Sequence, residues 1–419
     1  MADASLQIGN GNWGVKTSLL LGYNVVSNRY NPIEIGVTRE TLGSRTNVAG
    51  IIDYKGNNIA RINYASGVGS LLLEPQRTNL VLQSEAFDDV AWTKNNAPTI
   101  TTNIAISPNG TTTADGIKAD DGLNYKTISQ TKTVSANSTL TFSIFVKKVV
   151  SETFYGGFNI YFTGGTSKIC YGIVNAVNGT ITIVSSTITP ITSVVSFGDY
   201  WRICCTATDN GSNTSVKIDY YATLSQNGTS LNTGTGSVRT IWGAQLEVGA
   251  YPTSYIPTTI SATTRNADTF SRSNISTNGL ITSAGGTWFI ELNNNIAYIR
   301  DTFASGVYLD TTNGGFVNGF SIRTGVSTSQ TLTILKYVSG TPTALYNPTS
   351  NIVKIAIKWN GTTADVFVNG VKQVSATAFT TTAMEFLNAN ATDVPKYIKS
   401  TYLFPTPLTD TECINLTTI

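Results

Sequence analysis

The chain has 419 residues, of which 41% are hydrophobic and only 12% are charged, so it can bury more than one core and two or three domains are expected. Its net charge is +2 and no basic cluster interleaves with aromatic residues, which excludes an electrostatic nucleic-acid interface. Histidine is absent, which excludes histidine-based catalytic triads and the commonest metal ligand.

Residues 1–36 carry apolar side chains, but too few to bury a core of their own. We expect this segment to anchor the chain on another protein or to begin an oligomer contact, through Trp13, Leu19, Leu20, Leu21 and Tyr23. The alternative is an extra strand on the first sandwich. The N-terminus lacks the pattern of a signal peptide, and no apolar run reaches about 18 residues, so neither ordinary export nor membrane insertion is expected.

Residues 37–78 predict a small β region that leads into the first sandwich. The polar residues Glu74, Arg77 and Asn79, at its end, are the most prominent candidates for a site. Sugar binding is one interpretation of this cluster. We favour a structural one, in which Glu74 and Arg77 form an ion pair at a domain junction and Asn79 satisfies loop backbone groups.

Residues 79–257 predict an antiparallel β-sandwich. Apolar and polar residues alternate in segments such as Thr139–Val146 and Val216–Ala222. Because side chains alternate across a strand, this pattern is typical of half-buried strands. Asn-Gly pairs recur between such segments, and both residues tolerate the positive φ that tight hairpins require.

Tryptophans in this chain could either stack on sugar rings or fill the cores of the sandwiches. Five of them lie in or beside alternating segments, and large aromatic residues in sandwiches are more often core residues. We therefore assign no glycan site to Trp92, Trp201, Trp242, Trp288 or Trp359.

The cysteines predict neither a zinc ribbon nor a redox motif, because no Cys-x-x-Cys pair occurs. Cys204 and Cys205 are adjacent in a predicted strand and should point to opposite faces. We expect buried free thiols rather than a disulfide framework at Cys170, Cys204, Cys205 and Cys413.

Residues 266–419 predict a second sandwich of jelly-roll type, after a linker at Tyr251–Arg265. Within it, Val353–Val374 indicates three strands joined by turns at Asn360-Gly361 and Asn369-Gly370. Thr409 and Glu412 have the spacing of a capping box before an apolar run, which predicts one short terminal helix.

The acidic residues of the sequence give little indication of a catalytic or metal-binding site. Hydrolysis of a glycan needs two facing carboxylates, and the sequence has no Glu-x-Asp-x-Glu strand. We expect no cofactor and no catalytic residue. Calcium stays an alternative, with oxygen ligands from Asp115, Asp120 and Asp121 or from Asp209-Asn210-Gly211, although turn chemistry explains these residues equally well.

Ordered motifs over about residues 37–270 resemble bacteriophage head-fibre and tail-fibre proteins. The motifs are VTRETLGSRTNVAGII at Val37–Ile52, ARINY at Ala60–Tyr64, SLLLEPQRTNL at Ser70–Leu80, Ser84–Phe87, Trp92–Lys94, Tyr200–Arg202, WGAQLE at Trp242–Glu247, TSYIPT at Thr253–Thr258 and Arg265–Asp268. Residues 266–419 resemble a concanavalin or laminin-G sandwich through Lys354–Gln373 and Tyr402–Leu416.

This resemblance implies sandwiches of carbohydrate-binding-module type, a place in the virion after assembly in the host cytoplasm, and a homotrimer. It implies a structural, glycan-binding fibre attached to another virion protein through the N-terminal region, with a head fibre favoured over a tail fibre because no long shaft precedes the motifs. The alternatives are a glycan-depolymerising tailspike and a bacterial surface adhesin.

Overall fold

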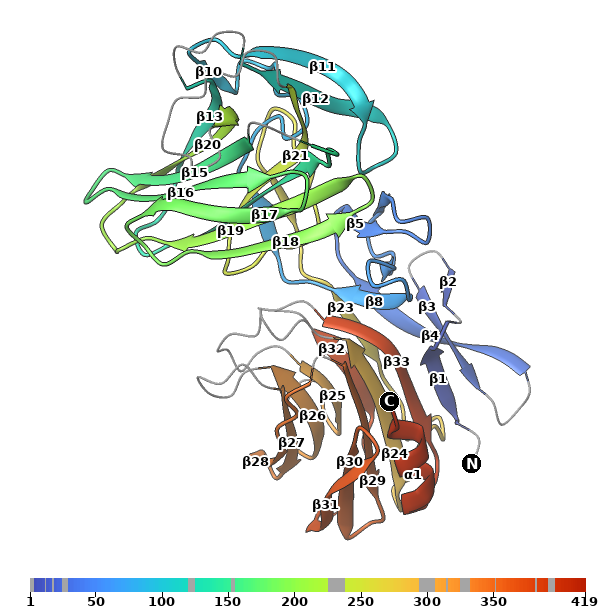
Figure 1. Cartoon of the computed structure of the whole chain (residues 1–419). Coiled ribbons are helices and arrows are strands. Elements are labelled where there is room, and N and C mark those ends of the chain that lie inside the picture. The colour runs from blue at the N-terminus through green and yellow to red at the C-terminus, as the bar shows by residue number, and fades with distance from the viewer. Residues whose placement is uncertain are drawn as a thin grey trace. The chain divides into compact units, whose positions relative to one another are not determined.

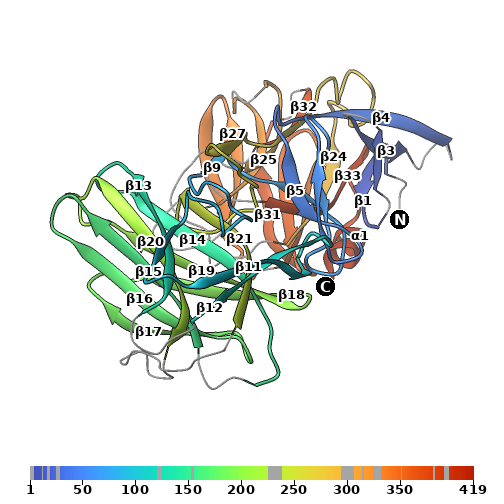
Figure 2. The same cartoon turned by 90° about the horizontal axis from the view of Figure 1, so that it is seen from above.

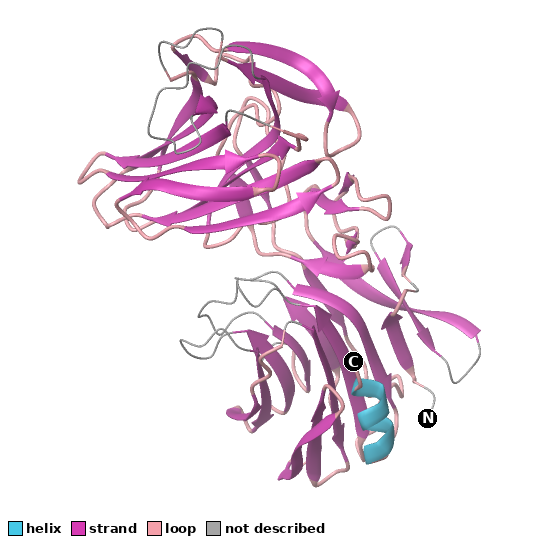
Figure 3. Cartoon of the chain, viewed as in Figure 1, coloured by secondary structure: helices cyan, strands magenta, loops and turns pink. Residues whose placement is uncertain are grey.

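The computed structural model describes the chain except for residues 1–3, 12, 17–18, 25–28, 120–124, 152–154, 225–237, 294–305, 314–315, 325–331, 351, 381–382 and 391–395. The chain forms two compact units (Figure 1). Unit 1 consists of Met1–Val48, Tyr54–Gln76 and Asn266–Ile419, and unit 2 of Ala49–Asp53 and Arg77–Arg265. The regular structure is almost entirely β-strand (Figure 3), which confirms the predicted all-β fold of antiparallel sandwiches.

Unit 2 is a sandwich of two six-stranded antiparallel sheets (Figures 1 and 2). The front sheet has the order β10 (Thr93–Asn95), β13 (Thr127–Thr133), β20 (Ser215–Leu224), β15 (Tyr155–Thr163), β16 (Lys168–Asn175), β17 (Thr180–Ser186). The back sheet has the order β11 (Thr99–Ile106), β12 (Thr112–Lys118), β21 (Val238–Val248), β14 (Thr139–Lys147), β19 (Tyr200–Thr208), β18 (Ile191–Phe197). Alternate residues of both sheets fill the core between them, as the period-two pattern predicts.

The segment predicted as a linker is instead part of unit 2. Tyr255 packs on Trp242 with ring centroids 4.6 Å apart, and Ile256 donates its backbone N–H to Gln245 Oε1 at 2.7 Å. Both Tyr255 and Ile256 are buried against the outer face of the back sheet. Prolines and threonines suggested a free linker, but the aromatic and apolar residues between them form contacts that a local pattern does not reveal.

Unit 1 has two layers whose strands belong to one continuous hydrogen-bonded set. The first layer contains β7 (Ile62–Asn63), β8 (Ser70–Leu73), β1 (Leu6–Gly9), β33 (Lys396–Phe404), β24 (Gly286–Asn293), β29 (Ile352–Trp359), β30 (Thr363–Val368) and β31 (Val371–Ala378). The second contains β2 (Gly14–Lys16), β3 (Leu19–Asn24), β4 (Arg29–Thr38), β23 (Thr269–Arg272), β32 (Phe386–Asn390), β25 (Gly306–Asp310), β26 (Gly319–Thr324), β27 (Leu332–Val338) and β28 (Thr341–Tyr346).

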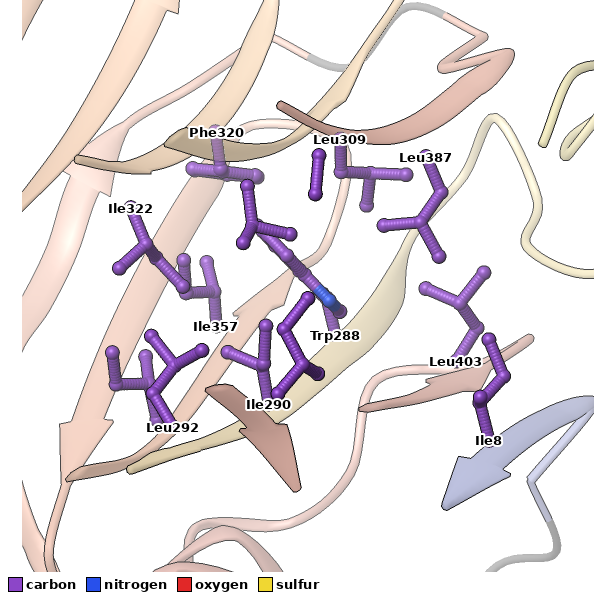
Figure 4. Close-up of a cluster of buried hydrophobic side chains, with 14 of the residues drawn as sticks. Ile8, Trp288, Ile290, Leu292, Leu309, Phe320, Ile322, Ile357, Leu387 and Leu403 are labelled. Atoms are coloured by element: carbon purple, nitrogen blue, oxygen red, sulfur yellow. The ribbon is translucent and has the colours of Figure 1, made fainter. Parts of the chain in front are cut away.

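A large apolar core lies between these two layers (Figure 4). Trp288 and Ile290 on β24 and Ile357 on β29 meet Leu309 and Phe320 from the second layer. The core residues of one strand alternate with residues that face outward, so each strand contributes every second side chain. The predicted meander is confirmed, with β29, β30 and β31 joined at the two Asn-Gly pairs.

The N-terminal residues are strands of unit 1 and not an extra strand on the first sandwich. β1 pairs with β33 over Leu6–Gly9, and β4 pairs with β23. Leu6, Ile8 and Ile35 lie in the core of unit 1. Residues expected as a separate segment and as a small β region thus share one core with the C-terminal sandwich.

Two short ribbons and one helix complete the described structure. The ribbons pair β5 (Gly43–Thr46) with β6 (Ile52–Lys55) and β9 (Arg77–Asn79) with β22 (Thr263–Arg265). Helix α1 (Asp410–Thr417) begins after the capping box of Thr409 and Glu412, which confirms the predicted terminal helix. It covers an apolar cluster on the outer face of the first layer of unit 1. No helix in the described part of the chain could span a membrane.

Candidate functional site

The predicted N-terminal contact residues do not form one visible surface. Trp13 is half-buried against the core of unit 1, and its Nε1 donates to the backbone oxygen of Gly69 at 3.1 Å. Leu19 is half-buried on β3. Leu20, Leu21 and Tyr23 lie on the same strand, but their side chains fall outside what the structure describes. Their role as an anchor stays a prediction.

Glu74 belongs to a buried ionic cluster in unit 1. Its Oε2 accepts from Arg61 Nη1 at 2.7 Å, and Arg61 also pairs with Asp268. Arg39 Nη1 donates to Asp268 at 2.9 Å and Arg39 Nη2 donates to the backbone oxygen of Gly56 at 2.7 Å. Two cations and two carboxylates therefore balance each other inside the unit, which is the arrangement that buried charge requires. Each of these four charged side chains thus has an ionic partner within unit 1, and a structural role stays the interpretation we favour.

Arg77 and Asn79 also make structural contacts, within unit 2. Arg77 Nη2 donates to the hydroxyl of Tyr251 at 3.1 Å, and Arg77 Nε lies 3.9 Å from Glu247 Oε2. Asn79 is fully buried: its amide nitrogen donates to two backbone oxygens and its amide oxygen accepts from two backbone N–H groups. The Glu74–Arg77 ion pair stays a prediction.

Four of the five tryptophans considered above are buried core residues, which confirms the interpretation we favoured. Trp92, Trp242, Trp288 and Trp359 have at most 2% of their surface exposed. Trp201 is half-buried, donates from Nε1 to the backbone oxygen of Ala176 at 2.9 Å and lies under Lys148 Nζ. None of them forms an open aromatic platform.

The calcium candidates lack a set of free oxygen ligands. Asp209 accepts from the backbone N–H groups of Asn137, Gly211 and Asn213 and from the side chain of Asn213. Asp115 accepts from the backbone N–H groups of Phe87 and Asn103. Asp120 and Asp121 lie outside the described residues. Across the chain as described, no group of three metal-ligating side chains comes together.

A different group of residues gathers on the outer face of the front sheet of unit 2. We call it the tyrosine face and define it by Tyr125, Asn159, Tyr171, Lys217, Asp219 and Tyr221. It arises because Asp219 and Tyr221 alternate on β20 with the core residues Ile218 and Tyr220. In the sheet register Asp219 lies opposite Asn159, and Asn159 lies opposite Tyr171.

On this face the ring of Tyr221 contacts two other tyrosine rings. The Tyr171 and Tyr221 centroids are 5.3 Å apart, and Tyr125 meets Tyr221 edge-on at 5.8 Å. Tyr125 is 37% exposed and the other two are half-buried, so the rings keep contact with solvent. Such rings offer apolar faces and polar hydroxyls at the same place.

Polar groups lie directly beside the rings. Asp219 accepts from Lys217 Nζ at 2.8 Å and from Asn159 Nδ2 at 3.3 Å. Asn159 is only 8% exposed, and no described residue donates a hydrogen bond to its Oδ1. An unpartnered buried amide oxygen is uncommon and destabilising unless another molecule pairs with it.

Burial changes the pKa values of the acidic and tyrosine side chains on this face. Desolvation raises the pKa of Asp219, against the opposing effect of Lys217. It also raises the pKa of Tyr171 and Tyr221, with neighbouring charge adding to the effect. Tyr171 and Tyr221 therefore remain neutral hydrogen-bonding groups at any ordinary pH.

The arrangement can bind a polyhydroxylated ligand, but its strands offer one acid only. Among the described residues of the six front-sheet strands, Asp219 is the only carboxylate. The apolar alternation that predicts these strands marks their core side and does not point to this face. The signal was present, since tyrosines recur on the polar side at Tyr161, Tyr171 and Tyr221.

No family model and no curated protein matches the chain. Among solved structures, domain 4 of a GH43 arabinanase from Geobacillus stearothermophilus, solved with arabinotriose, is 15% identical with a TM-score of 0.28, covering 40% of this chain and 82% of that one. The CBM22 tandem of Paenibacillus barcinonensis Xyn10C is 10% identical with a TM-score of 0.28, covering 80% and 99%. Trypanosoma rangeli sialidase with sialic acid is 9% identical with a TM-score of 0.23, covering 72% and 59%. Scores this low carry no inference about function.

Proposed function

We propose that this protein is a glycan-binding protein without catalytic activity and that the tyrosine face of unit 2 is its carbohydrate site. One observation carries the proposal: Tyr221 contacts the rings of Tyr125 and Tyr171, beside the buried carboxylate of Asp219 and the unpartnered amide oxygen of Asn159. Aromatic rings pack against the C–H faces of sugars, while a carboxylate and an amide accept hydrogen bonds from sugar hydroxyls.

Binding is favoured over cleavage because hydrolysis of a glycosidic bond needs two carboxyl groups about 5–10 Å apart. Asp219 is the one acid that the described front-sheet strands supply. A single shallow face gives weak affinity, so useful binding would come from several copies displayed together.

Substitution of the two central rings tests the site. We expect Tyr171→Ala and Tyr221→Ala each to weaken binding about tenfold, because each removes one stacking surface. Wild-type protein would be screened on a glycan array, and the best neutral oligosaccharide would then be titrated by calorimetry. Tyr346→Ala, at a half-buried tyrosine of unit 1, is the matched control. Unchanged affinity in both front-sheet variants would refute the site, and binding to no glycan at all would refute the function.

The same proposal places the protein in a bacteriophage particle as a short fibre, on the head rather than the tail, and as a homotrimer attached to another virion protein through its N-terminal region. The resemblance of residues 37–270 to phage fibre proteins supports this placement. Mass spectrometry of washed particles and a density map of the intact virion test it. If the polypeptide is missing from purified particles, the placement is wrong, whether or not the protein binds glycans.

A further inference from the structure

A second polar and aromatic cluster lies in unit 1, on the outer face of the second layer. Tyr308 on β25, Ser321 on β26 and Leu335 on β27 lie side by side in the sheet register, and Asn388 on β32 flanks Tyr308. These residues alternate with core residues such as Leu309 and Ile322, so they point away from the core.

Arg323 is at the centre of this cluster. It is 8% exposed, and its guanidinium carbon lies 4.1 Å from the ring centroid of Phe316 and 5.4 Å from that of Tyr337. No described carboxylate lies within ion-pair distance of it, unlike Arg39 and Arg61 in the same unit. A guanidinium stays charged at any ordinary pH, and a buried charge without a counter-charge is unfavourable.

Several polar atoms on the same face also lack partners. Tyr337 Oη, Ser321 Oγ and Thr312 Oγ1 are hydroxyl oxygens that can donate or accept, and Asn388 Oδ1 and Asp310 Oδ2 can accept. All five are buried without a hydrogen bond among the described residues. Most buried polar atoms in native proteins are paired, so these unpaired atoms can serve as partners for a ligand. Asp310 is the one carboxylate among them, and it forms no ion pair with Arg323. A site with both donors and acceptors can bind a sugar, because sugar hydroxyls both donate and accept hydrogen bonds.

The cluster reaches solvent at Asn313, shortly after β25. Asn313 is exposed there, and its Oδ1 accepts from Asn388 Nδ2 at 2.9 Å. Phe316 is half-buried and stands edge-on to Tyr308, with centroids 5.1 Å apart. A ligand can therefore approach beside Asn313 and meet the guanidinium, which lies over the adjacent rings of Phe316 and Tyr337.

We propose that this face of unit 1 is a second binding site, selective for saccharides that carry a carboxylate. Arg323 would pair with the carboxylate, Phe316 and Tyr337 would contact the sugar ring, and Ser321 and Asn388 would bind its hydroxyls. The site is independent of the tyrosine face, which has no unpaired cation: there Lys217 is already bound to Asp219.

Matched acidic and esterified sugars test this selectivity. Wild-type protein would be titrated by calorimetry with oligosaccharides of galacturonate, glucuronate and N-acetylneuraminate, and with their methyl esters, which keep the ring and remove the charge. We expect binding of at least one acid and a loss of roughly 10- to 100-fold in affinity for its ester. Equal affinity for acid and ester, or binding of none of the acids, would overturn the proposal.

Variants locate the site. We expect Arg323→Gln to abolish the preference for the acid, while Lys354→Gln, which removes the same charge from the first layer of unit 1, leaves it unchanged. Tyr337→Phe removes only an unpartnered hydroxyl, so it should fold normally and still weaken binding, which a purely structural role would not produce. A protein carrying Tyr171→Ala and Tyr221→Ala should keep acid binding. If it loses acid binding, the ligand occupies the tyrosine face and the second site is refuted.

Discussion

The buried side-chain amide of Asn79 connects several backbone segments of unit 2 through hydrogen bonds. Its side chain bonds the backbone of residues 81, 244, 246 and 256, which joins three separate stretches of unit 2. Removing it would leave several buried backbone groups unpaired, and each such group is destabilising by about 1–3 kcal/mol.

We therefore predict that Asn79→Ala lowers the free energy of unfolding by about 2–4 kcal/mol. Denaturant unfolding followed by tryptophan fluorescence measures this, since Trp92 and Trp242 lie in unit 2. Asn178→Ala is the control, because Asn178 accepts a backbone hydrogen bond in an exposed turn. A loss as small as that of the control would contradict the structural role of Asn79.

The four cysteines are free and buried, as the sequence predicted. Cys170 and Cys205 face each other across the core with sulfur atoms 3.5 Å apart. Burial raises the pKa of Cys204, and it raises that of Cys413 to about 12. Because the thiolate is the reactive form and none of the four is accessible, we predict no labelling of the native protein by iodoacetamide. Mass spectrometry should show four adducts after denaturation, and rapid labelling of folded protein would contradict the burial.

At the scale of elements, helix α1 is held by a cluster of four charges. Lys372 lies 2.9 Å from Asp410 and 3.1 Å from Asp365, and Lys358 contacts both carboxylates. These lysines lower the pKa of Asp410, and backbone and lysine contacts lower that of Asp365 against the effect of burial. A lowered pKa in the folded state means that this stabilisation is complete above the unfolded-state pKa and is lost as pH falls through the folded one.

We predict that the free energy of unfolding of unit 1 falls on acidification below the ordinary aspartate pKa, and that Asp410→Asn weakens this dependence. Unfolding curves measured between pH 7 and pH 2 provide the test. Asp199→Asn, at an exposed aspartate 3.8 Å from Lys147 in unit 2, should leave the dependence unchanged. An identical pH profile in wild type and Asp410→Asn would show that the cluster contributes nothing.

Local patterns in the sequence predicted individual strands, turns and the helix correctly, but they did not predict which of these elements pack together. The Asn-Gly turns of the β29–β31 meander and the capping box of Thr409 need only neighbouring residues, and both were correct. The wrong linker at Tyr251–Arg265 and the missed tyrosine face depend on contacts between distant strands. Alternation tells which side chains share a face, but not which strands lie next to each other.

At the scale of the whole molecule, unit 1 is built from the two ends of the chain. Leu6, Ile8, Ile35, Leu71 and Leu73 come from the N-terminal part and fill the same core as the C-terminal sandwich. Each buried side chain of this size contributes about 1.5–3 kcal/mol, so together they match the net stability of a typical domain. The sequence could not show this, because residues more than 300 positions apart in it, such as Leu6 and Leu403, pair in the sheet.

We predict that a fragment of residues 266–419 does not fold alone, since both layers around its core would lose strands. Joining residues 1–76 to it through a flexible linker should restore a cooperative transition. Circular dichroism melting and the dispersion of amide NMR signals distinguish the two states. A cooperative transition in the isolated fragment would show that the N-terminal strands are dispensable for the core.

The pairing of β9 with β22 sets Arg77 opposite Arg265, the first and last residues of the long segment of unit 2. The chain therefore leaves unit 1 and returns to it at neighbouring positions, so unit 2 is an insertion into a loop of unit 1. Apart from the short stretch 49–53, unit 2 is therefore a single insert with adjacent ends, so a change in its length would not reroute the chain of unit 1. One pair of adjacent junctions thus joins almost all of unit 2 to unit 1.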